Sequence, residues 1–445
     1  MESIYIGILG LGTVGSGVLN TLEKNRTIIE EDLGSPIRIK RALVKNVNGY
    51  GHLNIPSDLT ITDDINDILD DPDISIVVEV MGGIHPAKEF ILEALRRGKS
   101  VVSANKDLVS LHGPEIVKTA VENAADFMCE ASVGGGIPIL LPLQKSLKAN
   151  QITEIVGIIN GTTNYILTEM TEKNMSYRDA LTNAQKLGFA EADPTADVGG
   201  FDAARKIAIL SSIGFRANVT SDDVSVEGIE AIDSKDIQFA KEFGYVIKLL
   251  AVARQQPEGI AAAVYPAFVP QDHPLAAVRG AYNAVYIVGN AVDDIMFYGK
   301  GAGSYPTASA VLGDVLEIAA HLHHHTTGKN AWLKENNPAQ FMDPNFVLSS
   351  YYFRLIVDNA PGVLSEISQC FAQDGVSIKT MWQRGNLEET AEIVMVVYPA
   401  GDTAIQNVRA RLQNLNCVRE IANVLRVLGA VSYTHLRAHE TAANL

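Results

Sequence analysis

The sequence predicts an α/β protein of three domains, and three observations lead to this fold class. With 445 residues, the chain is long enough for about three domains that each bury a core. In the first 130 residues, short apolar runs alternate with helical patterns, which is typical of a doubly wound parallel sheet. Near the end, the order strand, helix, strand, strand, helix, strand predicts a ferredoxin-like βαββαβ domain. Between them lies a region in which we expect a mixed α+β domain.

The chain starts with a glycine-rich turn between a strand and a helix. Ile4–Leu9 is a β-type apolar run, and Val14–Glu23 has apolar residues at helical spacing. The glycines between them have the spacing G-x-G-x-x-G, which suits a tight turn, close approach of a pyrophosphate and close packing of helix on strand. This context predicts a Rossmann-type dinucleotide-binding domain. We expect the nucleotide to contact Gly10, Gly12, Thr13, Val14 and Gly15.

The second predicted strand, Ile37–Val44, indicates which dinucleotide to expect. In NAD-binding domains this strand usually ends near an acid that binds the ribose 2′-hydroxyl. Lys45 and Asn46 stand at that place here. A cation tolerates a 2′-phosphate, so the sequence favours NADP, with NAD as the alternative. A solvated lysine at a strand end explains Lys45 equally well.

Two more strands continue this domain. Ile74–Val80 predicts a buried parallel strand, Pro86–Arg97 a helix and Ser100–Ser103 a further strand. Lys106 follows directly, at the carboxyl edge of the sheet, where ligands bind in such folds. Lys106 is therefore a candidate to contact a phosphate or a substrate carboxylate.

A group of acids precedes a lysine in the middle of the chain. Glu191, Asp193 and Asp197 lie in a loop with several glycines and a proline, and Asp202 and Lys206 lie four residues apart on the helix that follows. Such an i,i+4 pair is by default a surface ion pair of about 0.3–0.5 kcal/mol. The acidic loop favours a site instead, because carboxylates bind an ammonium group and a lysine can protonate an aldehyde that accepts a hydride.

Several motifs in a single order resemble the homoserine dehydrogenases. These are GLGTVG, SANK, EASVGGGIPI, NGTTNYIL, GFAEADPTADVGGFDAARK and GKGAGSYPTASAV, and the resemblance covers nearly the whole chain. It implies reduction of L-aspartate 4-semialdehyde to L-homoserine with NADPH or NADH, in the biosynthesis of threonine, methionine and isoleucine. Two other classes stay open: a nicotinamide oxidoreductase acting on another amino-acid aldehyde or imine, and a non-catalytic amino-acid sensor.

The resemblance also implies roles for individual residues. It makes Lys206 the proton donor and places Lys106 between substrate and cofactor. The substrate-binding residues that it implies are Glu191, Asp197, Asp202, Gly161 and Thr162. It places two further glycines, Gly188 and Gly303, beside the nucleotide. From the residues alone, Asn160 or Thr162 can simply cap the helix that starts there.

The stretch around residues 129–139 has three possible interpretations. The resemblance implies a monovalent cation, usually sodium, bound by Glu130 and by backbone oxygens of Val133, Gly135 and Ile137. The residues alone favour a structural turn. Cys129 resembles a thioester-forming nucleophile in position only, since no base stands next to it.

We expect the histidines at a helix end, His321, His323, His324 and His325, to complement the helix dipole rather than to bind a metal.

After a polar, proline-bearing linker at Lys334–Pro344, the last third resembles an ACT domain. Such domains pair across chains and bind amino acids at their first turn, here Asp358–Leu364. The resemblance implies feedback inhibition by threonine, with Asn359 and Gly362 as regulatory contacts. A purely structural dimerisation module is the alternative.

We expect domains at residues 1–130 (completed by a helix near 305–330), 131–304 and 345–430, with 431–445 a non-native tail.

The net charge of −16 and the lack of a basic tract argue against binding nucleic acid or an anionic membrane surface. Three scattered cysteines suggest no disulfide framework. No uncharged apolar stretch approaches the ~18 residues of a membrane helix. We expect a cytoplasmic homodimer or homotetramer whose partner is a small-molecule substrate.

Overall fold

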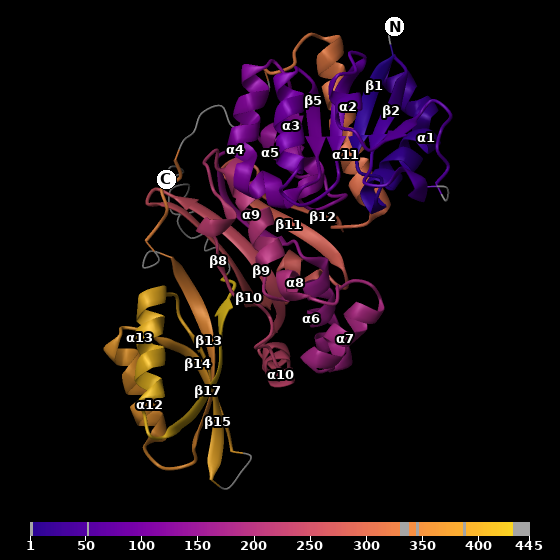
Figure 1. Cartoon of the computed structure of the whole chain (residues 1–445). Coiled ribbons are helices and arrows are strands. Elements are labelled where there is room, and N and C mark those ends of the chain that lie inside the picture. Colours follow the sequence, from indigo (N-terminus) through magenta and orange to yellow (C-terminus); the bar gives the residue numbers. More distant parts are fainter. Residues whose placement is uncertain (1–2, 51–52, 330–337, 344–346, 386–388, 430–445) are drawn as a thin grey trace.

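The computed structural model describes residues 3–50, 53–329, 338–343, 347–385 and 389–429. Figure 1 shows the first third of the chain at the top, the middle third below it and the last third at the lower left. Helix α11, at residues Ser304–His323, returns to the first third after the middle region has been completed. The predicted α/β fold class is confirmed. The predicted tail, 431–445, lies outside the described residues.

The first sheet has six strands, all parallel, in the order β3-β2-β1-β4-β5-β6. This is the doubly wound order of dinucleotide-binding domains. Four strands lie where the sequence predicts them, and the other two are too short to show a pattern. The strands are β1 (Ile4–Leu9), β2 (Ile37–Leu43), β3 (Thr60–Thr62), β4 (Ile74–Glu79), β5 (Ser100–Ser103) and β6 (Phe127–Met128).

Helices cover both faces of this sheet because successive side chains of a strand point to opposite sides. In β4, Ile76 and Val78 pack in the cluster that includes residues of α1 and α11, whereas Val77 packs in the cluster that includes residues of α3 and α4. The helices are α1 (Thr13–Leu33), α3 (Ala87–Arg96) and α4 (Lys106–Glu122), besides α11 and the short α2 (Asn66–Leu69). Helix α1 is longer than predicted and ends only at Gly34, whose φ of 72° is left-handed.

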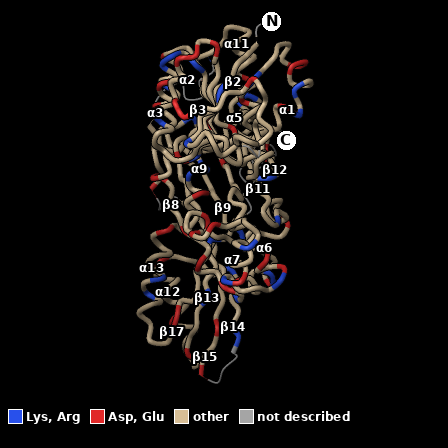
Figure 2. Tube along the Cα trace, turned by 45° about the vertical axis from the view of Figure 1, so that its right-hand side comes forward, with Lys and Arg blue, Asp and Glu red and all other residues tan. Residues whose placement is uncertain are grey.

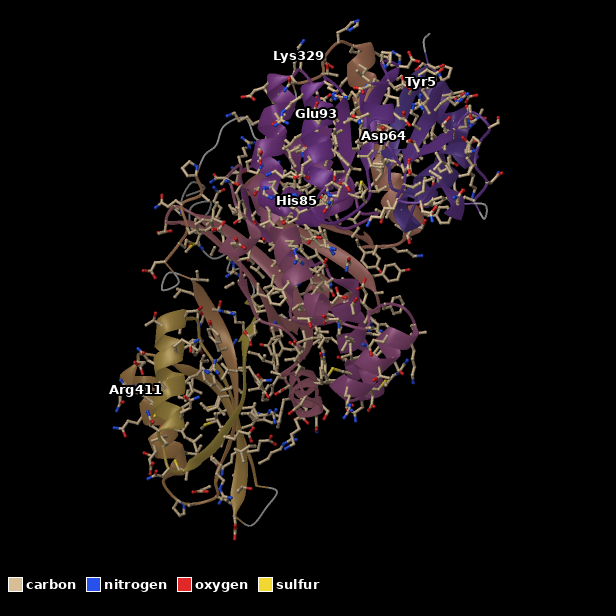
Figure 3. The ribbon with its side chains drawn as sticks, viewed as in Figure 1. Tyr5, Asp64, His85, Glu93, Lys329 and Arg411 are labelled. Atoms are coloured by element: carbon tan, nitrogen blue, oxygen red, sulfur yellow. The ribbon has the colours of Figure 1, made fainter. Side chains whose placement is uncertain are left out.

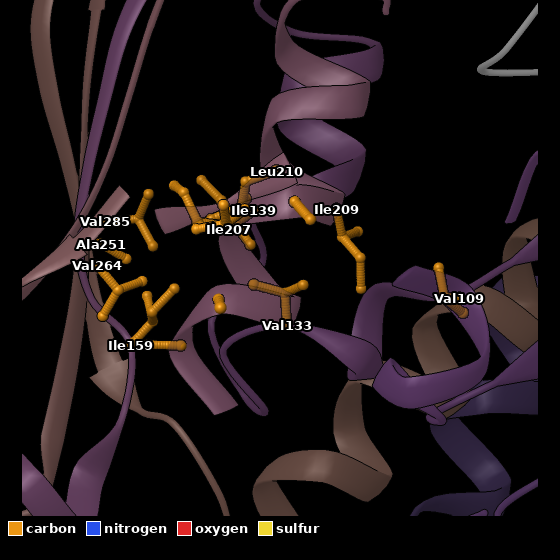
Figure 4. Close-up of a cluster of buried hydrophobic side chains, with 14 of the residues drawn as sticks. Val109, Val133, Ile139, Ile159, Ile207, Ile209, Leu210, Ala251, Val264 and Val285 are labelled. Atoms are coloured by element: carbon orange, nitrogen blue, oxygen red, sulfur yellow. The ribbon is translucent and has the colours of Figure 1, made fainter. Parts of the chain in front are cut away.

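The middle region forms an antiparallel sheet in the order β12-β11-β7-β9-β10. Helices α6 and α9 pack on it, and α10 contacts β9. Figure 4 shows the apolar core between helix and sheet, with Ile207 and Leu210 near Val285. The strands are β7 (Ile152–Ile158), β9 (Tyr245–Gln256), β10 (Gly259–Pro270), β11 (Tyr282–Gly289) and β12 (Asp293–Lys300). The helices are α5 (Leu140–Gln144), α6 (Gly161–Lys173), α7 (Tyr177–Lys186), α8 (Thr195–Val198), α9 (Phe201–Gly214) and α10 (Ser234–Glu242).

The last third has the predicted βαββαβ order, with its strands arranged β17-β13-β15-β14. Its sheet continues that of the middle region, since β17 pairs in parallel with β10 through Ala267 and Arg426 and through Phe268 and Val427. The sequence analysis does not predict this continuity. The elements are β13 (Leu348–Asp358), α12 (Val363–Gln373), β14 (Ile378–Gly385), β15 (Thr390–Val397), α13 (Asp402–Gln413) and β17 (Val418–Val427).

The described part of the linker also lies against the middle sheet. The amide of Ile260 donates to the carbonyl of Gln340 at 2.7 Å, and Met342 donates back to Ile260 at 2.9 Å. A Cβ on Gly259 would lie 2.5 Å from that Gln340 carbonyl, so this position needs glycine. The linker predicted from its polar composition is thus in part a bridge that pairs with β10.

Charged groups are buried where the last domain meets the middle one. Arg354 on β13 donates from Nε to Asp236 at 2.7 Å and from Nη2 to Asp233 at 2.6 Å. Asp236, on α10, is fully buried and also accepts from Asn423 at 2.7 Å and from the hydroxyl of Tyr352 at 3.2 Å. The face of the last sheet opposite α12 and α13 is therefore fixed to the middle domain by polar contacts.

Charges of both signs are interspersed along the chain (Figure 2). Among the described residues, no helix has the length and the apolar composition needed to cross a membrane.

Replacing Arg354 with Met should destabilise the protein by about 3–5 kcal/mol, because Asp236 stays buried without its cation. Arg411 points outward from α13 (Figure 3), but the side chain of its partner Asp374 is only 9% exposed, so Arg419→Met is the better control. Arg419 pairs with Asp358 at 2.6 Å, and 49% of the arginine and 38% of the aspartate side chain are exposed. That exposed pair is worth about 0–1 kcal/mol. Urea denaturation of both variants measures the difference, and equal losses would contradict the assignment.

Candidate functional site

The glycine turn after β1 has the geometry of a phosphate-binding loop. Gly10 has a φ of 104°, and its amide donates to the carbonyl of Leu43 at 2.9 Å, which holds the start of the turn to the end of β2. A Cβ on Gly15 would lie 2.0 Å from the Gly10 carbonyl, so helix and turn can pack only with glycine there. A Cβ on Gly12 would meet no atom within 4 Å. The open side of the turn, at the start of α1, suits a pyrophosphate.

Of the other residues expected at the nucleotide, Gly303 is brought to this turn. Its φ is 121°, and the next residue, Ser304, donates from its hydroxyl to the carbonyl of Thr13 at 2.7 Å. Lys45 is exposed just after β2, and no carboxylate stands beside it in the sequence. Gly188 follows α7 with a φ of 76°, and no described contact links it to the turn.

A buried acid that the sequence analysis missed organises the carboxyl edge of the first sheet. Glu79, at the end of β4, accepts the hydroxyl of Ser103 at 2.7 Å and the amides of Met81 at 2.8 Å and Gly82 at 3.2 Å. Burial raises the pKa of this carboxyl, against the effect of these donors. The Ser103 hydroxyl in turn accepts the amide of Asn105 at 3.1 Å, directly before Lys106. The only sign of this residue in the sequence was a single acid at the end of the apolar strand β4.

The centre of the site is one aspartate between two lysines. Asp202 receives the ammonium of Lys106 on one oxygen at 2.9 Å and that of Lys206 on the other at 2.7 Å. Burial alone would raise the pKa of Asp202, but the two ammonium groups outweigh it and hold that pKa well below its usual range. Burial would likewise lower the pKa of Lys106, and Asp202 raises it instead. Asp202 and Lys106 are therefore both charged at neutral pH.

Two helices from different domains bring these charges together. Lys106 is the first residue of α4, and Asp202 and Lys206 lie in the first turns of α9. The neighbouring residues form a second bridge between the same helices, from Arg205 to Asp107 at 2.8 Å. Figure 4 shows apolar side chains packed around α9, among them Ile207 and Ile159. The cluster thus forms only when both domains are folded against each other.

Asn160 joins this cluster to a second acid. Its side-chain amide donates to Asp202 at 2.9 Å and to Asp197 at 2.7 Å, while its oxygen accepts the amide of Thr163 and caps α6. The carbonyl of Ile159, one residue earlier, accepts from the ammonium of Lys206 at 2.8 Å. The sequence analysis predicts the cap and misses the bridge, because Asp197 and Asp202 are distant from Asn160 in the sequence.

The remaining residues expected at the substrate lie around this cluster without entering it. Glu191 is exposed and makes no ion pair or side-chain hydrogen bond among the described residues. The hydroxyl of Thr162 is already used, since it donates to the carbonyl of Phe189 at 2.7 Å and ties the acidic loop to α6. A Cβ on Gly161 would lie 2.9 Å from the carbonyl of Ala281, which indicates a close backbone contact at the start of α6.

The carboxylate of Glu130 binds backbone amides. It accepts from Ile139 at 2.5 Å, Leu140 at 2.8 Å and Leu141 at 2.6 Å, and so caps α5. Within the described part of the chain, no hydrogen bond reaches the carbonyl oxygens of the other residues expected at a cation, Val133, Gly135 and Ile137. These three oxygens are the kind of ligand that a hard cation takes.

Neither alternative chemistry finds support in the geometry. The thiol of Cys129 is buried, and burial raises its pKa, which opposes the thiolate that a nucleophile needs. His321 pairs with Asp126 at 2.8 Å and with Glu317 at 3.1 Å, and His323 bonds to Ser35 at 2.9 Å. Among the described residues, no group of three or more His, Cys, Asp or Glu could hold a metal ion. His321 and His323 thus join the end of α11 to Asp126 and Ser35 of the nucleotide-binding domain.

The first turn of the last domain is exposed. Asn359 donates its amide to the carbonyl of Glu389 at 3.0 Å, and Gly362 precedes α12 with a φ of 95°. Glycine suits this left-handed position. The turn lies at the end of β13 that is remote from the linker (Figure 1).

Comparison with known proteins decides the family. A homoserine dehydrogenase family model matches residues 138–316, and a model for the homoserine dehydrogenase NAD binding domain matches residues 10–130. Homoserine dehydrogenase from Bacillus subtilis is 40% identical over 96% of this chain and 99% of its own length. The chain belongs to the homoserine dehydrogenase family. A model for an AHAS small subunit-like ACT domain matches residues 353–420, which confirms the predicted ACT-like domain.

Solved structures of homoserine dehydrogenases agree with this assignment. The enzyme from Thiobacillus denitrificans is 38% identical, covers 96% of this chain and 99% of its own, and has a TM-score of 0.91. The enzyme from S. aureus is 34% identical, with 97% and 100% coverage and a TM-score of 0.76. A hyperthermophilic archaeal homoserine dehydrogenase in complex with NADPH is 25% identical, with 72% and 98% coverage and a TM-score of 0.61.

Asp202→Asn should move the alkaline limb of the pH–activity profile to lower pH by about one unit or more, because Lys106, whose pKa Asp202 raises, then lacks its anion. Because the pKa of Asp202 is lower in the folded protein, its carboxylate charge stabilises the fold fully at pH values above the pKa of an unfolded aspartate, about 3.9. This stabilisation is lost as the pH falls below that value. Asp197→Asn is the control, since Asp197 contacts Asn160 rather than a lysine. Profiles of kcat/KM measure the shift. An unmoved limb in Asp202→Asn would contradict the charged cluster.

Proposed function

We propose that the chain interconverts L-aspartate 4-semialdehyde and L-homoserine with a nicotinamide dinucleotide, in the biosynthesis of threonine, methionine and isoleucine. The observation that carries this proposal is the cluster of Lys106, Asp202 and Lys206, with its buried carboxylate, at the edge of a dinucleotide-binding sheet. Family membership supports the same reaction. An aldehyde carbon that accepts hydride needs a proton for its oxygen, and the cluster supplies a held ammonium group.

Lys206 is the proton donor in this proposal. Its ammonium has three hydrogens, and the described contacts use two, to Asp202 at 2.7 Å and to the carbonyl of Ile159 at 2.8 Å. The third is free to point at the aldehyde oxygen. A bound nicotinamide supplies the hydride, so Lys206 needs no Schiff base. After the transfer, Asp202 and the Ile159 carbonyl still hold the neutral amine in place.

The acids and the second lysine bind the amino-acid part of the substrate. Asp202 and Asp197 share the Asn160 amide, so their positions are fixed before substrate arrives. Glu191, on its exposed loop, adds a carboxylate for the α-ammonium group. Lys106 has only one described ion pair, to Asp202, and its remaining hydrogens can meet the substrate carboxylate and the cofactor.

The cofactor that we propose is NADP, with NAD as the alternative. Gly10, Gly12 and Gly15 form the open turn for the pyrophosphate, and Lys45 stands where an NAD-binding domain usually carries an acid. The solved archaeal relative is a complex with NADPH. Contacts from Gly188 and Gly303 belong to the same proposal.

We also propose a sodium site at Glu130, Val133, Gly135 and Ile137. The three backbone oxygens accept no hydrogen bond within the described chain, and such oxygens suit a hard cation. Glu130 is the charged residue that lies closest to them in the sequence. Such an ion would fix the loop that packs on residues 301–302, where a Cβ on Gly135 would lie 2.5 Å from the Gly301 carbonyl. Its role would be structural support of the nucleotide site.

The ACT-like domain supports a proposal of feedback inhibition by threonine through Asn359 and Gly362. We further propose a homodimer or homotetramer, since the long sheet ends in β12 and β14, and each has a single neighbour among the described strands. Free cysteines at positions 129, 370 and 417 fit a cytoplasmic location.

One assay tests these proposals together. Oxidation of L-homoserine, followed at the nicotinamide absorbance, should proceed faster with NADP than with NAD at equal low concentration. Threonine should inhibit it, and replacing sodium by choline in the buffer should slow it. A panel of other amino alcohols separates this reaction from related oxidoreductases. No turnover of homoserine with either cofactor would refute the proposed function.

Lys206→Ala should lower kcat by about 10²–10⁴-fold, the range for loss of a positioned proton donor. NADPH binding, followed by its fluorescence, should be unchanged, because Lys206 contacts no residue of the glycine turn. Lys145→Ala is the control: that lysine forms a partly exposed ion pair with Glu317 and should keep normal turnover. If Lys206→Ala kept wild-type kcat, the lysine would have no part in the mechanism.

A further inference from the structure

A second buried lysine lies beneath α6 and has no role in the reaction described above. Lys248, on β9, is only 4% exposed. Burial lowers the pKa of its ammonium to about 8, and Arg279 adds to the effect. Within the described residues it forms no ion pair, and it donates instead to the side-chain oxygen of Asn164 at 3.0 Å and to the carbonyl of Val278. Lysine is rarely buried without a carboxylate, so this one requires an explanation.

Asn164 uses the rest of its amide to hold a loop. Its nitrogen donates to the carbonyls of Gly280 at 2.9 Å and Tyr282 at 3.1 Å, and lies 3.3 Å from that of Val278. One turn later on α6, the hydroxyl of Thr168 accepts the amide of Gly280 at 3.1 Å. Residues 278–282 are therefore attached to α6 at several backbone groups, with Lys248 beneath them.

The attached loop meets the residues that arrange the substrate site. Asn164 lies one turn after Asn160, whose amide holds both Asp197 and Asp202. The carbonyl of Ala281, in the middle of the loop, lies 2.9 Å from where a Cβ of Gly161 would stand. A shift of the loop would therefore move the start of α6, and with it Asn160 and the carbonyl of Ile159 that holds Lys206.

We propose that Lys248 and Asn164 are positioning residues of the substrate site, which act through the 278–282 loop on the start of α6. The inference rests on the proposed function. Neither residue reaches the reacting atoms. They determine the position of Asn160, and through it the distance between the carboxylates of Asp197 and Asp202, which bind the substrate ammonium in the proposed function.

Two variants test the pair. Lys248→Met keeps the apolar stem and removes the ammonium. Asn164→Asp keeps an oxygen for Lys248 and removes both amide hydrogens that hold the loop. In each, KM for homoserine should rise about tenfold or more, since small misplacements of binding groups are costly. KM for NADP should stay within about twofold, because the glycine turn lies in another domain.

Lys99→Met is the matched control. Lys99 is also buried and also donates to two backbone carbonyls, those of Asp71 at 2.6 Å and Ile74 at 2.7 Å, but it lies in the nucleotide-binding domain. Its loss should lower thermal stability to a degree comparable with Lys248→Met and leave KM for homoserine unchanged. An equal rise in KM in this control would show general destabilisation and overturn the proposal.

Far-ultraviolet circular dichroism and a cooperative urea transition report whether each variant is folded. If Lys248→Met does not fold, Asn164→Asp and the milder Thr168→Val carry the test. Folded variants with wild-type kcat and KM for homoserine would overturn the positioning role while leaving the proposed function intact. Failure of the wild-type chain itself to oxidise homoserine would instead refute the proposed function.

Discussion

The arrangement of the molecule depends on the buried carboxylate of Asp202 between two ammonium groups. An unpaired charge at such a place would cost several kcal/mol, so each of the three groups requires the others. Lys106 belongs to the nucleotide-binding domain, and Asp202 and Lys206 to the middle domain. The same interaction therefore stabilises the domain interface and raises the pKa of Lys106.

The layered fold could be predicted from the sequence because its signals are local. The turn after β1, the continuous apolar run of β4 and the order of elements in the ACT-like domain all depend on neighbours in sequence. The continuous sheet through β10 and β17 could not, since that pairing joins residues far apart, Ala267 and Arg426. The length of α1 was underestimated because its second half is polar and exposed.

The same division holds for the site. Lys206 and Asp202 were recognisable from their helical spacing and the acidic loop before them. Asn160 was recognisable only as a helix cap, although its amide also bridges Asp197 and Asp202. Glu79 and Lys248 act through partners in other elements, and a single charged residue in an apolar strand does not reveal them. Resemblance to the family supplied the roles of Glu191 and Thr162, whose described contacts would not have suggested them.

The docking of α10 against the ACT-like sheet limits how that domain can act. Arg354, Asn423 and Tyr352 each donate a hydrogen bond to Asp236 of the same chain. When helices cover only one face of a sheet, the other face can bind a partner protein. Here α10 already packs against that face. A second such domain would have to approach along the edge strand β14 or over the helical side. Within the described chain, this domain is joined to the middle one through α10, the pairing of β10 with β17 and the linker residues that bond to Ile260.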